Sequence, residues 1–241
     1  MQRRVKFMSF LSAREIADRA RFQAWILDDC SHRLLQEVAG LKGLVVNLAF
    51  EPSGQRPRRE YEDAANLARS CDVVVEYWFA DAGEFTVVSR LLDRLGLAER
   101  TGQRHEFRVE ETVIADQGFS RCTGVTHGVK YIGRLRFHAD LPGSAARRSW
   151  AIHGELAVHV FEKLTKYVQN MVVETIGADT PVTHGIPELW FPDIDCFNAT
   201  APLGQERIAH DLRHLVASGV RLYTVEHVIE PACTTAAQQA P

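Results

Sequence analysis

The sequence has little excess charge and few cysteines, and each shortage excludes a class of function. Lysine and arginine number 28, against 31 aspartate and glutamate residues, so no strong overall field attracts nucleic acid or an anionic membrane. The 5 cysteines are widely spaced, odd in number and never form a Cys-x-x-Cys pair. This pattern argues against a disulfide framework and a thiolate zinc site, so we expect free thiols. From the charge balance we expect no nucleic-acid partner.

Long apolar runs and nucleotide-binding motifs are also missing. The longest apolar stretches, such as residues 44–50, are far shorter than a membrane span, and residues 1–4 lead into a strand-like segment without a signal-peptide core. The sequence has no phosphate loop, dinucleotide fingerprint or Gly-x-Ser-x-Gly elbow. We therefore expect a cytoplasmic protein with no membrane partner.

What the chain does contain is an internal repeat. Four short segments recur in the same order: 5–7 at 129–131, 40–47 at 163–170, 76–81 at 188–193 and 107–111 at 223–227. The offset runs from 112 residues (76 to 188) to 124 residues (5 to 129). This regularity predicts two copies of one module, at 4–115 and 128–230. A tail over 231–241 has few large apolar side chains and is predicted to be disordered.

Hydrophobic periodicity predicts the same order of elements in each module: strand, helix, strand, strand, helix, strand. In the second module we expect strands over 129–138, 167–174, 186–191 and 220–229, and helices over 144–164 and 205–217. In the first module we expect strands over 73–79 and 105–114, a helix over 83–95 and a solvated loop over 51–59. Gly96 and Gly219 are predicted to end the second helix of each module, because a left-handed residue after a helix favours glycine.

A βαββαβ module folds as a ferredoxin-like unit, with four antiparallel strands and both helices on one face. The other face of each sheet then needs cover, and two such sheets in one chain can cover each other by packing face to face. The sequence therefore predicts an α+β fold in which two ferredoxin-like modules pair their antiparallel sheets into one intrachain barrel. Because that pairing is satisfied within one chain, we expect a monomer or weak homo-oligomer.

The second module resembles the EthD-like family of dimeric α/β-barrel proteins. The resemblance lies in a helix with Trp150 and His153, the segment Leu-x-x-Tyr-Val-Gln-Asn ending at Asn170, Glu-Leu-Trp-Phe-x-Asp at 188–193 and Val-Glu-His-Val at 225–228. The first module matches more weakly. In this family a single module usually dimerises, so the chain is similar to a tandem fusion of that dimer. The family includes polyketide cyclases, dehydratases and decarboxylases, so the resemblance implies a fold more specifically than an activity.

Two departures from the family pattern concern its histidine. His153 follows Trp150 by three residues, whereas the family usually has four, which rotates the side chain by roughly 100° on an ideal helix. In the first module, Asp28 and Asp29 follow Trp25 where the histidine belongs. We therefore expect the second module to carry the activity and the first to be degenerate.

His153 is the leading catalytic candidate. It lies near the apolar stripe of its predicted helix, and burial would favour a neutral imidazole that can take a proton from a carbon acid or phenol. The alternative is a capping or surface histidine. Tyr167 and His227 are candidates for steadying the resulting enolate or phenolate. His227 aligns with Glu111 of the first module, and it serves this role only if its strand face looks into the barrel.

The candidate substrate-binding residues are mainly aromatic and gather in the second module. Trp78 and Trp190 occupy equivalent mid-strand positions, where they either pack in the core or form a wall for a planar ligand. Asn170 aligns with Asn47, which favours a shared structural role, and it lies on the opposite strand face from Tyr167. The full set of binding candidates is Trp150, Asn170, Trp190, Phe137 and Trp78.

Cofactor sites are weakly marked. Among the 10 histidines, the pair His210-x-x-x-His214 has zinc-like spacing, but it is predicted to lie on an exposed helix face. Nothing local marks an axial haem ligand. We therefore expect no metal and no cofactor.

Three functions stay open at this point. The leading one is a cofactor-free lyase or isomerase of the dehydratase, decarboxylase or cyclase type, acting on a hydrophobic aromatic or polyketide-like small molecule by histidine acid–base catalysis. The first alternative is a non-catalytic carrier or accessory protein of a catabolic or biosynthetic pathway. The second is a cofactor-free oxygenase, which oxygen uptake would distinguish.

Overall fold

The computed structural model describes residues 4–51, 71–117, 122–198 and 202–230. The predicted tail and nearly all of the predicted loop 51–59 lie outside these residues. The elements of the first module are β1 (Val5–Ala13), η1 (Ile16–Asp18), α1 (Arg19–Trp25), η2 (Ile26–Cys30), α2 (Ser31–Glu37), β2 (Leu41–Phe50), β3 (Val73–Phe79), η3 (Ala82–Glu84), α4 (Phe85–Arg94), α5 (Leu97–Arg100) and β4 (Thr101–Asp116). Those of the second are β5 (Gly124–Val125), β6 (Val129–Phe137), α6 (Gly143–Val160), β7 (Lys166–Ile176), β8 (Gly185–Phe191), α7 (Ile194–Asn198), α8 (Pro202–Leu215) and β9 (Val216–Glu230).

The strands of both modules form one closed antiparallel barrel. Its order is β2-β3-β1-β4 in the first module and β7-β8-β6-β9 in the second, and β5 adds to the edge of β9. The two sheets are joined at their edges by β4–β7 and β2–β9 ladders. Backbone hydrogen bonds between edge strands therefore add to the expected packing of one sheet face against the other. Closure leaves no unpaired sheet edge between the modules. The expected α+β barrel is confirmed.

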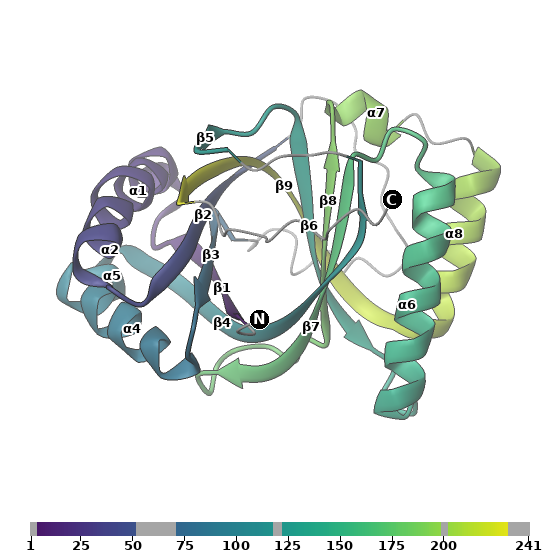
Figure 1. Cartoon of the computed structure of the whole chain (residues 1–241), viewed down its shortest axis with the longest axis horizontal. Helices are drawn as coiled ribbons and strands as arrows, with labels where there is room; N and C mark the ends of the chain where they lie inside the picture. Colours follow the sequence, from purple (N-terminus) through teal and green to yellow (C-terminus); the bar gives the residue numbers. More distant parts are fainter. Residues whose placement is uncertain (1–3, 52–70, 118–121, 199–201, 231–241) are drawn as a thin grey trace, which may run out of the picture.

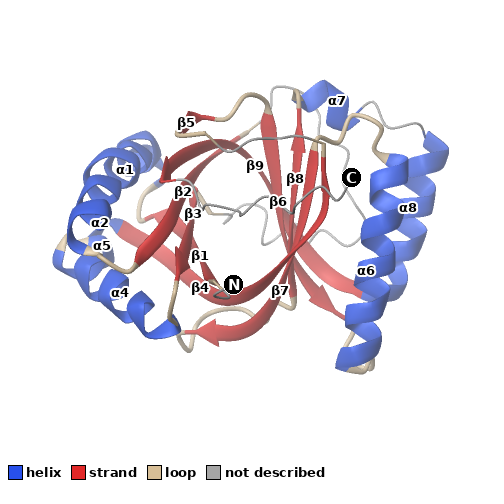
Figure 2. Ribbon diagram, viewed as in Figure 1, coloured by secondary structure: helices blue, strands red, loops and turns tan. Residues whose placement is uncertain are grey.

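Helices cover the outside of the barrel in two separate groups (Figure 1). The helices of the first module lie on one side, and α6 and α8 lie together on the opposite side (Figure 2). Among the described residues, no helix is both long and apolar enough to cross a membrane.

Alternation along the strands separates the packing inside the barrel from the cores under the two groups of helices. In β6, Tyr131 and Leu135 pack toward α6 and α8, whereas Ile132, between them, packs inside the barrel with Met8 and Phe107. The remaining core lies under the helices of the first module, where Phe85 stacks on Phe7. The strand period of two therefore gives each module one face for its helices and one for the shared interior.

The expected boundaries need few corrections. Gly96 has a left-handed φ of 87° after α4, as predicted. Gly219 does not end a helix, because α8 stops at Leu215 and Gly219 pairs with Leu135 inside the ladder between β6 and β9. The described residues between the two expected modules are partly strand, since β4 extends to Asp116 and β5 pairs with β9.

Candidate active site

A cavity lies between the sheet of the second module and its two helices. It has a volume of about 40 Å³ and an apolar lining in which the polar groups are few. Its lining comes from every main element of the module: Tyr131, Leu135, Trp150, His153, Ala157, Phe161, Tyr167, Pro187, Leu189, Phe197, Ile208, Leu212 and Arg221. Of the predicted site residues, the structure brings Trp150, His153 and Tyr167 together here.

His153 and Asp211 form a hydrogen-bonded pair at this cavity. His153 is 6% exposed, and its Nδ1 lies 2.6 Å from Oδ2 of Asp211 on the neighbouring helix α8. An aspartate at Nδ1 fixes the imidazole tautomer and stabilises the imidazolium once the other ring nitrogen, Nε2, gains a proton. The pair therefore has the geometry of an oriented general base.

Two glycines allow α6 to approach the sheet closely enough to place these residues. A Cβ on Gly154 would lie 2.8 Å from Nε2 of Gln169, and a Cβ on Gly185 would lie 2.7 Å from the Trp150 ring. Gln169 donates to the carbonyl of Trp150 at 2.7 Å and to the hydroxyl of Tyr167 at 3.1 Å. The amide of Gln169 thus ties α6 to β7 beside the cavity.

Arg221 is the cationic residue of the lining. It is 1% exposed, and its guanidinium carbon lies 5.8 Å from the ring centre of Phe197 and 5.7 Å from that of Tyr223. A guanidinium in an apolar setting interacts strongly with negative charge that develops nearby. Arg221 is therefore suited to stabilise an anionic form of a bound molecule.

The size of the cavity limits what this arrangement holds. A benzene-sized ligand occupies a cavity of about 150 Å³, so the cavity must enlarge to admit an aromatic molecule. A histidine with a carboxylate partner suits the axial position of a haem, but a porphyrin needs several times the volume of benzene. This cavity does not fit a haem in its present arrangement.

His227 lies elsewhere. It belongs to the part of β9 that pairs with Val46 of β2 and Val125 of β5, and it does not line the cavity. Burial is the main cause that lowers its pKa, against the opposing influence of Asp28 and then Glu226. The structure separates His227 from His153.

The barrel registers also change the alignment of the repeat at His227. Lys6 pairs with Val109 and Lys130 pairs with Thr224, so the structural counterpart of Glu111 is Glu226. The expected match of Glu111 with His227 is therefore wrong by one residue. A one-residue shift reverses the face of a strand, which is why the alignment misplaced the side chain.

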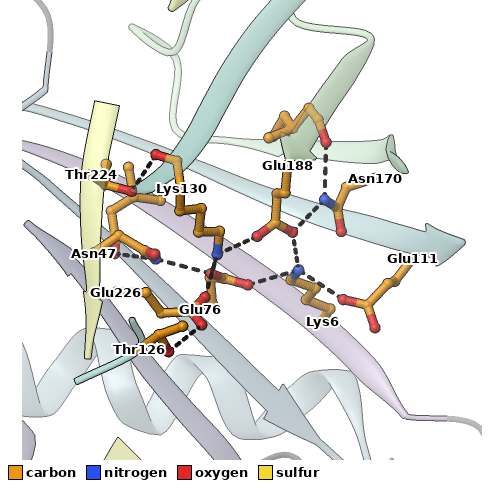
Figure 3. Close-up of polar contacts among 12 residues, drawn as sticks. Lys6, Asn47, Glu76, Glu111, Thr126, Lys130, Asn170, Glu188, Thr224 and Glu226 are labelled. Carbon is orange, nitrogen blue, oxygen red and sulfur yellow. Dashed lines mark hydrogen bonds and ion pairs between the residues drawn. The ribbon is translucent and has the colours of Figure 1, made fainter. Parts of the chain in front are cut away.

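Asn170 and Asn47 belong to a charged network inside the barrel (Figure 3). Each amide donates to a glutamate of the neighbouring strand, Asn170 to Glu188 at 2.6 Å and Asn47 to Glu76 at 2.9 Å. Each also donates to a backbone carbonyl of that strand. The equal partners confirm the shared structural role expected for the two asparagines.

Two lysines, one from each module, form ion pairs with glutamates of both modules. Lys6 lies 2.5 Å from Glu188 and 2.8 Å from Glu76, and Lys130 lies 2.5 Å from Glu188 and also contacts Glu76. Each lysine has a third carboxylate partner, Glu111 for Lys6 and Glu226 for Lys130. Sequence reasoning missed this network, although the repeated Lys6 and Lys130 could have drawn attention to it.

The remaining aromatic candidates lie outside the cavity lining. The lysines of the network lie over the two tryptophan rings, Lys6 at 4.8 Å from the centre of Trp78 and Lys130 at 4.5 Å from that of Trp190. Phe137 packs edge-on against Trp150 at 5.6 Å and supports the cavity from behind. These contacts favour packing over direct contact with a ligand.

Asp211 and Arg221 are the site residues that sequence reasoning missed. Asp211 lies between His210 and His214, which the sequence predicts on an exposed helix face. Arg221 lies on a predicted strand, and nothing in the sequence distinguishes it from the other arginines of the chain. No spacing relative to His153 marks either, because the three residues come from different elements. Within the described residues, no group of three or more His, Cys, Asp or Glu is arranged to hold a metal ion.

No protein-family model and no curated protein matches the sequence. Solved structures do share the fold over nearly the whole chain. An anthrone oxidase-like protein is 7% identical with a TM-score of 0.65, and the match covers 97% of this chain and 96% of that one. A candidate monooxygenase from Fusobacterium nucleatum is 9% identical, with coverage of 94% and 92% and a TM-score of 0.56. A chlorite dismutase mutant from Candidatus Nitrospira defluvii is 8% identical, with coverage of 94% and 92% and a TM-score of 0.55.

Proposed function

We propose that the cavity beneath α6 and α8 binds a hydrophobic aromatic or polyketide-like molecule, and that His153 removes a proton from it without a cofactor. The observation that carries the proposal is the bond between His153 and Asp211 at the wall of an apolar cavity. The EthD-like resemblance agrees with it and stays part of the proposal.

The first chemical step follows from the charges around the substrate. Nε2 of His153 takes a proton from a phenol or an activated carbon, and the carboxylate of Asp211 stabilises the resulting imidazolium. The substrate becomes a phenolate or enolate. Arg221 stabilises that anion, and the apolar lining of the cavity strengthens both interactions.

The second step distinguishes an oxygenase from a lyase or isomerase. In an oxygenase, a deprotonated CH₂ group reacts with dioxygen and becomes a carbonyl, while the second oxygen atom leaves as water. In a lyase or isomerase, the same anion expels a leaving group or is reprotonated elsewhere, and no oxygen is used. The fold is shared with proteins named as an anthrone oxidase-like protein and a candidate monooxygenase, which favours the oxygenase over the lyase.

Oxygen uptake with an anthrone-type substrate tests the proposal. His153→Ala should lower turnover at least about a hundredfold with the fold retained, because the proton acceptor is lost. Asp211→Asn should lower it about tenfold or more through loss of orientation. His159→Ala, a change at an exposed position on the same helix, is the matched control and should leave turnover unchanged.

Three outcomes would count against this assignment. Full activity of the His153 variant would remove the general base, and turnover without oxygen uptake would favour the lyase. Binding of every tested aromatic acid without any product would favour the carrier. Addition of haemin serves as a further control: a Soret shift that requires His153 would contradict a cofactor-free mechanism.

A further inference from the structure

Arg134 lies on the face of β6 opposite the catalytic cavity. Residues two apart on a strand share a face, so Arg134 lies on the same barrel-facing side as Lys130 and Ile132. Its neighbours Gly133 and Leu135 lie on the face that the helices cover. Its guanidinium carbon lies 5.2 Å from the ring centre of Phe10. The side chain is half-buried, so solvent reaches it at the end of the barrel remote from the lysines.

His105 of β4 meets this guanidinium from the other module. Nη1 of Arg134 lies 2.9 Å from Nδ1 of His105. Because a guanidinium only donates, Nδ1 must accept, which places the imidazole proton on Nε2. Burial and then the charge of Arg134 lower the pKa of His105 to about 4, so the ring is neutral near pH 7 and offers a second donor.

Arg134 has no carboxylate partner among the described residues. The ion pairs and hydrogen bonds of the described chain give it His105 alone. Burial lowers its pKa, with the thiol of Cys71 as the opposing influence. Cys71 does not supply an anion, since burial raises its own pKa to about 12. The surroundings are otherwise apolar: Phe10 and Cys71 are 1% and 6% exposed and belong to the barrel core.

We propose that Arg134 and His105 form a binding site for the carboxylate of a small organic acid. A carboxylate pairs with a guanidinium through two parallel hydrogen bonds, and within the described residues no carboxylate forms an ion pair with Arg134. The buried ring of Phe10 lies under the guanidinium, so the carboxylate approaches Arg134 from its solvent-accessible side.

The site is not repeated in the barrel. Register places Phe10 opposite His105 in the first module and Arg134 opposite Val220 in the second. The pseudo-symmetric position of Arg134 is therefore Phe10, and that of His105 is Val220. The pairing of a cation with an imidazole therefore occurs at one of the two equivalent places, with one residue from each module. The site is also distinct from the catalytic cavity, whose lining includes none of these residues.

Titration of the full-length protein with benzoate, followed through the side-chain NMR signals of His105, tests the site. Wild-type protein should show a saturable shift at benzoate concentrations on the order of 1 mM, as expected for a fragment held by one charged pair. Arg134→Gln should weaken binding at least tenfold, and Arg134→Lys should weaken it less, because lysine keeps the charge but not the paired donors. Arg136→Gln, at an exposed residue two positions along, should bind as wild type does.

The same signals define the results that would overturn the site. An unmoved His105 at about 50 mM benzoate, or equal shifts in the wild type and in Arg134→Gln, would refute it. Shifts confined to His153 would place benzoate in the catalytic cavity instead. Equal shifts with inorganic phosphate would show that the site does not select a carboxylate and would refute that part of the proposal. Raising of the His105 pKa in Arg134→Gln would show that the variant is folded and that the guanidinium was its neighbour.

Discussion

The two modules use the same scaffold but differ under their helices. In the first module Trp25 is half-buried and Asp28 is exposed, and η2, a turn of π-helix, follows Trp25. In the second, Trp150 is 1% exposed and His153 is 6% exposed on a continuous α6. An extra residue in one turn rotates the residues that follow it about the helix axis. The two modules therefore differ at this position both in residue identity and in helix phase, and the second module alone buries a histidine there.

Aromatic packing completes the difference. Phe85 stacks on Phe7 with ring centres 4.3 Å apart, while the corresponding Phe197 stacks on Tyr131 at 5.5 Å. The first module also buries Tyr77 completely, and burial raises the pKa of that phenol. The matching residue of the second module is Leu189, which lines the cavity. One module has filled the space that the other keeps partly open.

Separating the modules should have the largest effect. The second module expressed alone, from residue 128 to 230, would expose the β7 and β9 edges and its half of the barrel interior, whose apolar area contributes about 25 cal/mol per Å² when buried. We expect it to aggregate or dimerise in light-scattering measurements. A soluble monomer with cooperative unfolding would show that the two modules are independent domains.

Removing a cation from the charged network should have the next largest effect. Lys130→Met leaves Glu76, Glu188 and Glu226 without their shared partner, and we expect a loss of about 3–5 kcal/mol in the free energy of unfolding. Lys6→Met should cost less, because its third partner, Glu111, has a side chain that is 23% exposed. Urea unfolding of both variants measures the difference. Equal or negligible losses would contradict this account of the network.

A smaller effect on stability should distinguish α6 from the equivalent helical segment of the first module. Gly154→Ala introduces a Cβ within 2.8 Å of Gln169, and we expect it to destabilise the protein by about 1–3 kcal/mol and to reduce turnover. The corresponding residue of the first module is Asp29, which is exposed, so Asp29→Ala is the matched control and should stay within about 0.5 kcal/mol. Thermal unfolding and the oxygen assay would test both. A neutral Gly154 variant would mean that α6 does not need its close approach.

Local pattern was sufficient for the architecture. The repeat, the order of elements and the chain ranges of most strands follow from alternation and from short matching motifs such as Glu-x-Trp-Phe and its counterpart Glu-Tyr-Trp-Phe. Predictions failed where register mattered. Gly219 was placed after a helix and is in a strand, and His227 was aligned one residue away from its structural position. Ladder registers depend on distant partners, such as Leu135 for Gly219 and Val46 for His227, which a single segment does not encode.

The sequence by itself determined that the chain is a duplicated βαββαβ module, and it pointed to His153 as a candidate site residue. Only the tertiary structure decided which side chains lie together. Asp211 reaches His153 because α8 packs beside α6, Arg221 enters the cavity from β9, and Arg134 meets His105 across the two modules. The physical reason is the range of the interactions. Secondary structure depends on nearby residues, whereas a site joins side chains from separate elements that only closure of the barrel brings together.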